Sequence, residues 1–429
     1  MMKILWLTNS ILPVTAEIIR AERGLTGGWT DALSRDLISS KEAELISVYP
    51  SKGAKKNVSG EEAGLKWYGF KAPKTAPLKY DRKRYRYFRK LIKKERPDIV
   101  HIWGTEYTYA AEMSDASRGI VPTVVSIQGI ISECAARYTE RIPSRVLGRK
   151  TFHDFIRKDD ILRQQQKFSI RGEFEKKALG GVKHVIGRTD WDKAKIKELN
   201  PDAVYHHCEE TLREEFYNGE SWSLDKCEKH SIFMAESYYP IKGMHIAVRI
   251  LRRLKNRYPD VKLYTTGRDP RCRGIRNRFR QNTYENYISR LIQRYGLDGN
   301  LICLGRLGAK EMKERYLLAN VYLQASVIEN SPNSLSEAII TGTPSVASDV
   351  GGTSSVVGEF GPVCLYDIDK PEQAAKMIGR IFDRRKAEDF GVYREMRDYA
   401  LKKHDIQAVT RQYMDCYKEI LQEAGGAGK

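Results

Sequence analysis

Two series of short apolar runs, each alternating with helical segments, constrain the fold of this chain more than any other feature. The polar stretch 215–229 separates the two series and indicates an interdomain linker. Short apolar runs between helices are typical of parallel strands that are covered by helices on both faces. The pattern therefore predicts an α/β protein with two Rossmann-like domains. The first series is 3–8, 45–48, 99–103, 123–127 and 184–187, and the second is 231–235, 261–265, 301–304, 321–324 and 345–347.

The length of the chain also predicts two domains. At 429 residues the chain exceeds what a single core usually holds. We expect residues 1–214 to form the first domain and residues 215–404 the second, with a cleft at the carboxyl ends of both parallel sheets. A final amphipathic helix is expected within 405–424. No apolar run reaches the length of a membrane-spanning helix, and the start of the chain indicates a buried strand rather than a signal peptide.

The seven cysteines are scattered and are never arranged as Cys-x-x-Cys. This pattern favours free thiols in a reducing cytoplasm over a disulfide framework or a zinc site. Asp-x-Asp, a motif that can hold a divalent ion on a diphosphate, occurs at Asp190/Asp192 and at Asp367/Asp369. Both pairs lie in polar connections without the flanking pattern of such a site. We therefore expect neither a metal ion nor a cofactor.

The net charge of +19 calls for an acidic partner or surface, and the cations are densest in residues 79–96. In this segment Tyr85, Phe88, Leu91 and Ile92 form an apolar stripe at helical spacing, surrounded by cations. Three interpretations stay open: a solvated helix that packs by its apolar edge, a contact with an anionic membrane surface, or a contact with nucleic acid. Nucleic acid is the least favoured because no recognised binding motif accompanies the segment.

The pair Glu329 and Glu337 gives the clearest chemical signal in the chain. The two carboxylates bracket a small polar turn that leads into an apolar helical run, and the first turns of this helix are expected at 333–340. A helix start carries about half a positive charge and roughly four unpaired N–H donors, which suit a phosphate. Glu337 can accept hydrogen bonds from hydroxyl groups, and Glu329 ends the preceding strand. Together these groups predict a site for a sugar attached to a nucleoside diphosphate.

The stretch 327–352 contains this Glu-x7-Glu element, followed by Gly-Thr-Pro and Asp-Val-Gly-Gly. It resembles the retaining glycosyltransferases of the GT-B fold, family 4 (glycosyl transferases group 1). The resemblance covers most of the chain and is weakest from about 132 to 174. It implies transfer of a sugar from a nucleoside-diphosphate sugar to a glycan or lipid-linked acceptor with retention of configuration, in cell-surface polysaccharide synthesis. It also implies that the final helix crosses back to the first domain, where Tyr413 and Tyr417 would anchor it.

Two glycine-containing elements match donor-binding elements of this family. The pair Gly27 and Gly28 follows the first strand, where relatives contact the diphosphate of the donor or the acceptor. Lys242, before Gly243, matches a lysine whose ammonium meets the pyrophosphate. In contrast, Ser237 stands where relatives usually carry an arginine. One cation is therefore missing from the expected site.

Substitutes for the missing cation and further donor contacts follow from the same resemblance. Arg268 and Arg306 both follow apolar runs of the second domain and are candidate substitutes. The segment Gly305, Arg306 and Leu307 matches the part of the family that faces the nucleobase. The turn and helix start between the two glutamates contribute Asn330, Ser331, Asn333, Ser334 and Leu335.

The resemblance and the chemistry of the two glutamates together assign roles. The amides of 333–335 and the ammonium of Lys242 would stabilise the leaving diphosphate, because donors aimed at developing charge lower the barrier most. Glu337 would bind the ribose hydroxyls. Glu329 would hold the donor sugar and stabilise its oxocarbenium character. The departing phosphate can itself take the proton of the acceptor.

Three residues of the first domain are acceptor candidates. Gln128 stands where many relatives have a histidine, so it cannot act as a base near neutral pH but can bind a sugar hydroxyl, and we count it with Glu329 and Lys242 as catalytic. His101 also follows a strand, and a packed core histidine is the alternative. Arg188 follows a strand and could meet an anionic acceptor, or it could be structural.

Two other functions remain open from the sequence. A nucleotide-sugar epimerase or a phosphorylase could use the same fold and the same donor site. A basic protein that binds nucleic acid or a membrane surface would explain the net charge but would give the two glutamates no role.

Overall fold

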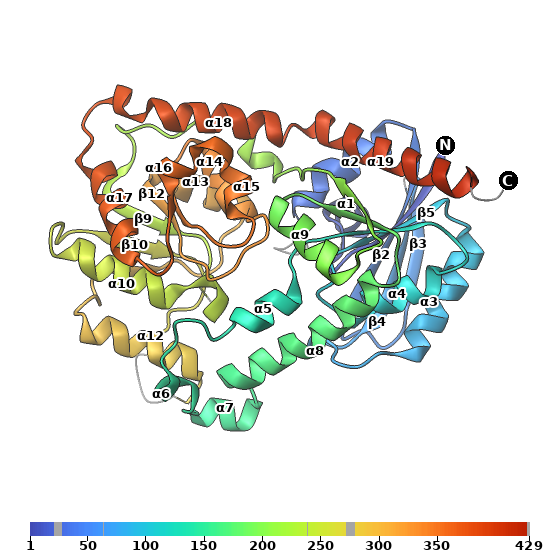
Figure 1. Cartoon of the computed structure of the whole chain (residues 1–429), viewed down its shortest axis with the longest axis horizontal. Coiled ribbons are helices and arrows are strands. Elements are labelled where there is room, and N and C mark those ends of the chain that lie inside the picture. Colours follow the sequence, from blue (N-terminus) through green and yellow to red (C-terminus); the bar gives the residue numbers. More distant parts are fainter. Residues whose placement is uncertain (21–27, 63, 238, 272–278, 427–429) are drawn as a thin grey trace. The chain divides into compact units, whose positions relative to one another are not determined.

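The computed structural model describes residues 1–20, 28–62, 64–237, 239–271 and 279–426 (Figure 1). The chain forms two compact units. Unit 1 consists of Met1–Ser132, Ser169–Glu214 and Lys403–Lys429, and unit 2 consists of Glu133–Phe168 and Glu215–Lys402. The sequence divides the chain at 214/215 as well. It assigns 133–168 to the first domain, however, whereas the structure groups this segment with unit 2.

The core of unit 1 is an eight-stranded sheet in the order β3-β4-β2-β1-β5-β6-β7-β8. All neighbouring strands are parallel except the antiparallel pair β3 and β4. The strands are β1 (Met2–Leu7), β2 (Ala43–Lys52), β3 (Val58–Glu62), β4 (Leu65–Ala72), β5 (Ile99–Trp103), β6 (Thr123–Ser126), β7 (His184–Gly187) and β8 (Val204–His207). The helices of its segments are α1 (Pro13–Ile18), η1 (Gly28–Thr30), α2 (Asp31–Ser39), α3 (Arg82–Glu95), α4 (Thr108–Ser117), α9 (Asp190–Leu199) and α19 (Ile406–Gly426).

Helix α19 packs on one face of this sheet and completes the core of unit 1. Its residues Val409, Tyr413, Tyr417 and Ile420 belong to one buried cluster with the strand residue Trp6. The indole Nε1 of Trp6 donates a hydrogen bond of 3.1 Å to the hydroxyl of Tyr417. The last helix is therefore part of the fold of unit 1.

Unit 2 contains a six-stranded parallel sheet in the order β11-β10-β9-β12-β13-β14. The strands are β9 (Glu228–Met234), β10 (Lys262–Thr265), β11 (Leu301–Cys303), β12 (Ala319–Gln324), β13 (Ser345–Ser348) and β14 (Leu365–Tyr366). The longer helices are α10 (Met244–Lys255), α12 (Thr283–Arg294), α13 (Ala309–Leu318), α14 (Asn333–Thr341), α17 (Pro371–Asp383) and α18 (Gly391–Lys403), and the shorter ones include η3 (Pro240–Lys242), α6 (Ser144–Leu147) and α7 (Phe152–Arg157).

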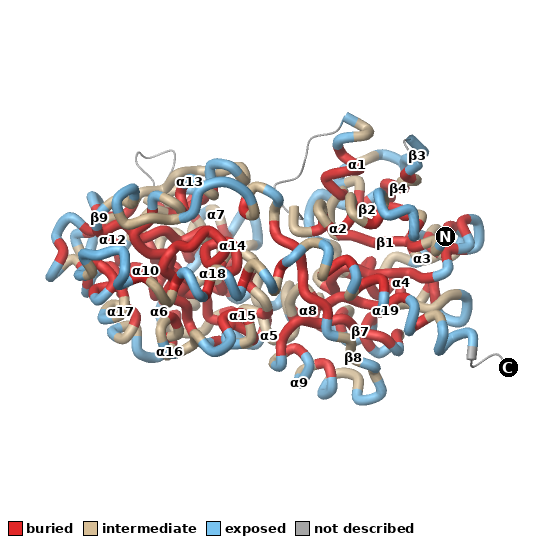
Figure 2. The backbone as a smooth tube through the Cα atoms, turned by 90° about the horizontal axis from the view of Figure 1, so that it is seen from above, coloured by how far each residue is buried: buried red, intermediate tan, exposed pale blue. Residues whose placement is uncertain are grey.

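Helices α5 (Ile131–Arg137) and α8 (Ile161–Leu179) each begin in one unit and end in the other. In both units the buried residues follow the strands and the helix faces against them (Figure 2). The predicted class, α/β with two parallel-sheet domains, is confirmed. Among the described residues, no helix combines the length and the apolar character needed to cross a membrane.

The basic segment 79–96 contains α3, whose apolar stripe is turned inward. Phe88, Leu91 and Ile92 are at most 4% exposed and belong to the core of unit 1. The apolar edge of this helix is therefore packed, as in the first of the three interpretations. The surface that it leaves to solvent is mainly cationic.

Candidate active site

The turn that contains Lys242 lies directly against the segment that follows β12. Because β9 and β12 are parallel neighbours, the loops after their carboxyl ends meet at one edge of the sheet. The amide of Val327 donates to the carbonyl of Ile241 at 2.8 Å. Gly243 has φ +72, and a Cβ at this position would lie 1.7 Å from the carbonyl oxygen of Ala325. Only glycine allows this approach, which fixes the adjacent lysine.

Lys242 and Glu329 form an ion pair at this edge. The ammonium lies 2.9 Å from Oε1 of Glu329 and 3.3 Å from Oε2 of Glu236. The hydroxyl of Ser326 donates to the same Oε1 of Glu329 at 2.6 Å. Burial opposes the charged form of Lys242, but the carboxylates of Glu329 and Glu236 outweigh it and raise its pKa well above the ordinary value. Lys242 is therefore a permanent cation, held by two acids.

The Asp-Val-Gly-Gly stretch holds the backbone of Glu329 from the other side. The amide of Gly352 donates to the carbonyl of Glu329 at 3.1 Å. Gly351 has φ +55, and a Cβ there would lie 1.9 Å from the same carbonyl oxygen. These glycines thus position the first acid of the Glu-x7-Glu element.

Helix α14 begins at Asn333, as expected, and carries Glu337 in its second turn. Pro332 occupies the N-cap, and no hydrogen bond from a described side chain caps this helix start. The amide of Leu335 donates to the carbonyl of Pro332 at 3.0 Å, so it already has a partner within the turn. Glu337 is 4% exposed.

Two tyrosine hydroxyls contact Ser334 in the first turn of α14. The hydroxyl of Tyr316 donates to the carbonyl of Ser334 at 2.9 Å, and the hydroxyl of Tyr322 lies 3.0 Å from its Oγ. Asn330 is buried and Ser331 is half-buried in the preceding turn. The structure therefore places Lys242, Glu329 and the start of α14 around the loops that follow β9 and β12.

Ser237, which stands at the position of the missing arginine, lies close to the loop that follows β10. The hydroxyl of Ser237 donates to the carbonyl of Thr266 at 3.1 Å, and Ser237 and Arg268 line the same small pocket. The guanidinium of Arg268 pairs with Glu285 at 2.7 Å. Arg306 is exposed and follows Gly305, whose carbonyl accepts from the amide of Gly267 at 2.7 Å in an isolated bridge. Of the two candidate substitutes, Arg268 is the one that the structure brings next to Ser237.

In unit 1, Gln128 and Arg188 converge on an acid that the sequence did not single out. The amide of Gln128 donates to Oε1 of Glu210, and the guanidinium of Arg188 pairs with Oε2 of Glu210. Arg188 also donates to the carbonyl of Ile127 at 3.0 Å and is 3% exposed. Burial opposes its charge, but Glu210 outweighs burial and raises the pKa of Arg188. Arg188 is thus a buried cation paired with Glu210, and Gln128 is hydrogen-bonded to the same carboxylate.

His101 lies in the packed core of unit 1. It is 0% exposed, its Nδ1 lies 2.6 Å from the hydroxyl of Tyr417, and its Nε2 lies 2.7 Å from Oγ of Ser126. Its ring stacks on Trp103 with a centroid distance of 4.1 Å. Burial lowers its pKa well below the ordinary value, which keeps it neutral. His101 is therefore a packed core histidine, and the prediction that it contacts the acceptor is corrected.

A second acid missed from the sequence, Glu106, follows β5 in the same sheet. The amide of Asn9, which follows β1, donates to Oε2 of Glu106. Gly104 has φ +84, and a Cβ there would lie 2.1 Å from the same oxygen. Burial raises the pKa of Glu106 to about 7, and the charge of Glu175 adds to this. Since the carboxyl ends of parallel strands share one edge, Asn9, Glu106 and Gln128 all follow strands at that edge.

The remaining sequence candidates have the following places. Gly27 lies outside the described residues. Gly28 begins η1, and a Cβ there would lie 2.9 Å from Cγ of Arg213. Leu307 is half-buried after β11.

The Asp-x-Asp pairs serve local structure. Asp192 caps α9, whose N-cap is Thr189, and accepts from the hydroxyl of Tyr205 at 2.6 Å. Asp367 pairs with Lys370 at 3.1 Å, and Asp369 pairs with Arg141. In the part of the chain that the structure describes, no group of three or more His, Cys, Asp or Glu side chains could hold a metal ion.

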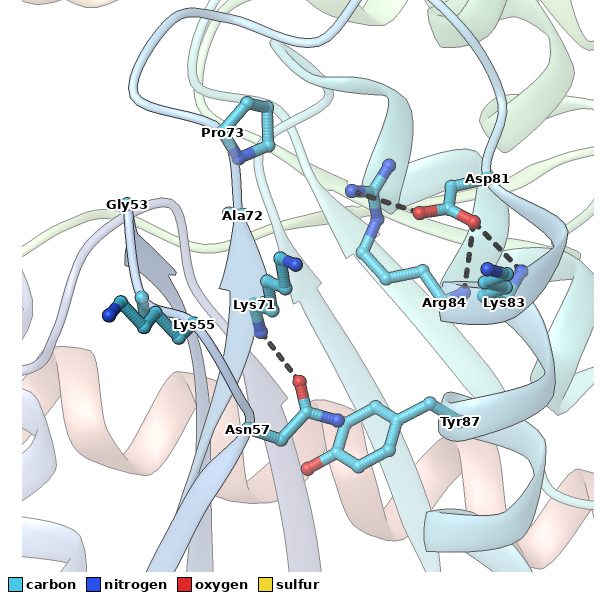
Figure 3. A pocket seen from close by; sticks show the side chains of 11 residues that line it. Gly53, Lys55, Asn57, Lys71, Ala72, Pro73, Asp81, Lys83, Arg84 and Tyr87 are labelled. Carbon is cyan, nitrogen blue, oxygen red and sulfur yellow. Dashed lines mark hydrogen bonds and ion pairs between the residues drawn. The ribbon is translucent and has the colours of Figure 1, made fainter.

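Unit 1 also has a basic pocket lined by the start of α3, the end of β4 and the loop that follows β2 (Figure 3). Lys55, Lys71 and Lys83 line it. Asp81 caps the helix by accepting from the amide of Lys83 at 2.8 Å. Arg84 turns to Glu112 on α4, with Nη2 2.8 Å from Oε1. The exposed cations of the pocket are therefore the three lysines.

Part of the chain matches a known protein family. Residues 221–402 match the family model described as glycosyl transferases group 1. This segment is less than half of the chain and contains Lys242, Glu329 and Glu337. YtcC of Bacillus subtilis (strain 168), whose name assigns it provisionally as a glycosyltransferase, is 26% identical over 157 residues. That match spans 36% of this chain and 37% of the relative.

Solved structures resemble the whole chain. Sucrose-phosphate synthase from Thermosynechococcus elongatus superimposes with a TM-score of 0.67 at 14% identity, over 99% of this chain and 100% of that chain. An α,α-trehalose-phosphate synthase (UDP-forming) from Burkholderia vietnamiensis has a TM-score of 0.65 at 11% identity, over 99% and 98%. HepE of Anabaena in complex with UDP and glucose has a TM-score of 0.62 at 13% identity, over 98% and 100%. The fold is therefore GT-B, as predicted.

Proposed function

From a GT-B fold whose second unit matches group 1 glycosyl transferases, we propose that this chain transfers a sugar from a nucleoside-diphosphate sugar to a glycan or lipid-linked acceptor. The observation that carries the proposal is the Lys242–Glu329 ion pair beside the start of α14. The cation Lys242, the carboxylate of Glu329 and the N-terminus of α14 all lie within the segment that matches the family model. Retention of configuration, membership of family 4 and a role in cell-surface polysaccharide synthesis belong to the same proposal.

The donor diphosphate binds at the start of α14 and Lys242. Negative charge grows on the diphosphate as the sugar–phosphate bond breaks, and preorganised donors stabilise that charge. The helix start and the ammonium of Lys242 supply them without a metal ion. Further donor contacts are proposed for Gly27, Gly28, Arg268, Gly305, Arg306, Leu307, Asn330, Ser331, Asn333 and Ser334. Leu335 is left out because its amide donates to the carbonyl of Pro332 and its side chain is buried.

The two glutamates bind the two remaining parts of the donor, the ribose and the transferred sugar. Glu337, inside α14, accepts hydrogen bonds from the ribose hydroxyls. Glu329 holds the donor sugar, and its carboxylate stabilises positive charge at the anomeric carbon. HepE was solved with UDP-glucose, and the Burkholderia vietnamiensis synthase is named UDP-forming, so a UDP-hexose is the first donor to test.

The acceptor side of the proposal uses unit 1. Gln128 binds an acceptor hydroxyl, and Arg188 with Glu210 holds Gln128 in place. His101 is left out because it has no exposed surface. The acceptor attacks from the face that the diphosphate leaves, and the departing phosphate takes its proton.

The cations of 79–96 are proposed to attract an anionic membrane surface or the charged part of a lipid-linked acceptor. Lys55 and Lys71, which line the pocket beside α3, add to this field. No disulfide joins the six described cysteines, which fits the proposed cytoplasmic location. Nucleic acid is not proposed as a partner.

A donor screen followed by a turnover assay tests the proposal. A panel of nucleotide sugars is added to the purified chain, and one of them should raise the melting temperature, because a ligand of the native state stabilises it. The same donor should then release its nucleoside diphosphate only with an acceptor present, and EDTA should leave the rate unchanged. Conversion of the donor without an acceptor would indicate an epimerase. If no nucleotide sugar raises the melting temperature, the proposed donor site is refuted.

A further inference from the structure

Large apolar side chains are concentrated on one exposed surface of unit 2. On α7, Phe152 is 58% exposed, Phe155 75% and Ile156 61%. Leu162, at the start of α8, is 46% exposed, and Phe279 is 55% exposed. The rings of Phe152 and Phe279 meet edge to face with a centroid distance of 5.6 Å. We call Phe152, Phe155, Ile156 and Phe279 the α7 surface.

Helix α7 is held firmly, so its apolar side chains are fixed in an outward position. A capping box joins Thr151 and Asp154 at its start. Asp154 is 0% exposed, accepts from the amide of Thr283 at 2.9 Å and thereby ties α7 to the start of α12. Thr283 also donates through its hydroxyl to the carbonyl of Arg149 at 3.1 Å. Residues 152, 155 and 156 share one face of a helix, and here this face is turned to solvent.

The exposed charged groups next to α7 in sequence are positive. Asp154 and Asp160 are at most 2% exposed, while the neighbouring cations are exposed on either side of α7. Half-buried Asp159 pairs with Lys167 at 2.9 Å. The exposed cations along this segment are Arg145, Arg149, Lys150, Arg157 and Lys158.

We propose that the α7 surface docks on an anionic lipid bilayer, with its phenyl and aliphatic side chains in the interface and the flanking cations on the headgroups. A cationic rim around exposed aromatic and aliphatic residues is the composition that binds bilayer interfaces, where apolar burial and electrostatic attraction add. A soluble protein rarely leaves so many large apolar side chains together in water. Helix α7 lies outside the segment 221–402 that matches the family model, and the docking proposal does not depend on the proposed transfer reaction.

Charge complementarity favours a bilayer over a second copy of the chain. Two copies of this surface would bring the same cations face to face, and like charges repel. The α3 segment differs from the α7 surface because its apolar stripe is buried in the core. It can add attraction to anionic lipid but has no comparable apolar side chains to insert.

Co-sedimentation of the full chain with vesicles tests the apolar part of the proposal. The wild type should bind phosphatidylglycerol–phosphatidylcholine vesicles more tightly than vesicles of phosphatidylcholine alone. The double variant Phe155→Ser/Ile156→Ser should bind the anionic vesicles at least about tenfold more weakly. The matched control Ile120→Ser/Val204→Ser removes side chains that are 37% and 38% exposed elsewhere and should bind as the wild type does.

Two charge variants test the rim. Lys150→Gln/Lys158→Gln should weaken binding by about tenfold, and raising the ionic strength should remove most of the difference from the wild type. Lys376→Gln/Arg380→Gln, with the same loss of charge on α17, should have a smaller effect. Unchanged melting temperatures would confirm that all four variants fold.

Vesicle binding that is indifferent to both α7 variants would overturn the proposal. So would light scattering of the vesicle-free protein that shows a dimer lost in Phe155→Ser/Ile156→Ser, if vesicle binding persisted. The donor-induced rise in melting temperature is measured separately. A failure of the α7 proposal and a failure of the proposed transferase function therefore give different results.

Discussion

Nζ of Lys242 lies 2.9 Å from Oε1 of Glu329, so the cation proposed for the donor diphosphate and the acid proposed for the donor sugar are bonded to each other. A bound diphosphate would compete with Glu329 for this ammonium. The pair can therefore hold both groups in position before the donor arrives, and its two members should respond differently to substitution.

Glu329→Ala should lower turnover by at least about 100-fold while the affinity for the nucleoside diphosphate stays the same or rises. The reason is that the alanine variant removes the acid that competes for Lys242 but leaves the ammonium. Steady-state kinetics and calorimetry with UDP measure the two effects. Glu236→Gln is the control, because Glu236 also contacts Lys242, at 3.3 Å, but has no proposed role with the sugar. Equal losses of binding and turnover in Glu329→Ala would contradict its assignment.

Glu337→Gln should lower the affinity for the nucleoside diphosphate at least about tenfold, because the amide replaces a charged acceptor of the ribose hydroxyls. Calorimetry measures this loss. With 2′,3′-dideoxyuridine diphosphate as the ligand, which lacks both hydroxyls, wild type and variant should bind equally. A variant that keeps full affinity for UDP would remove Glu337 from the donor site.

Gly243→Ala should destabilise the protein much more than Gly296→Ala. Both glycines have positive φ, +72 and +63, but only Gly243 faces a neighbour, the carbonyl of Ala325, while nothing lies within 4 Å of the Cβ position at Gly296. The control therefore isolates the backbone cost, about 1 kcal/mol. The clash should bring the total at Gly243 to about 3 kcal/mol or more. Thermal unfolding compares the two, and similar shifts in melting temperature would mean that the turn is free to move.

Glu106→Gln should change how stability depends on pH. Burial raises the pKa of Glu106 from the ordinary 4.5 to about 7 in the folded protein, with Glu175 adding to the shift and Asn9 and Arg171 opposing it. The folded state then holds its proton longer than the unfolded state. Relative to the variant, the wild type should lose about 1–3 kcal/mol of stability as the pH rises from about 4.5 to about 7, and no more above that. Chemical unfolding at several pH values measures the difference, and parallel curves would contradict the shift.

The fold could be predicted because buried parallel strands need continuous apolar runs. Each of the ten predicted runs coincides with a strand of the structure. The strands β3, β4, β8 and β14 were missed. Strands β3 and β8 lie at the edges of their sheet and are mostly exposed or half-buried, so they carry little apolar signal. Lysines interrupt the apolar run of β4, and β14 is an edge strand of only two residues.

The residues proposed for the donor side lie in short local motifs that can be read from the sequence, whereas Glu210 and Glu106 do not. Glu210 and Glu106 gain their positions from partners 82 and 97 residues away, Gln128 and Asn9, and no sequence spacing records such contacts. His101 was ambiguous because both faces of β5 are buried, so alternation along the strand gives no direction. The segment 133–168 follows the first-domain strands in sequence, but the structure groups it with unit 2, and no local pattern in the sequence indicates such a grouping.

The hydrogen bond between Trp6 and Tyr417 joins positions that are 411 residues apart. On the ribosome, β1 emerges before unit 2, yet the aromatic side chains of α19 that cover it are translated only after unit 2. Until then the nascent first unit must expose the face of its sheet that α19 will occupy, at a stage when incomplete domains aggregate most readily. Emergence of α19, rather than completion of either sheet, therefore completes the core of this unit.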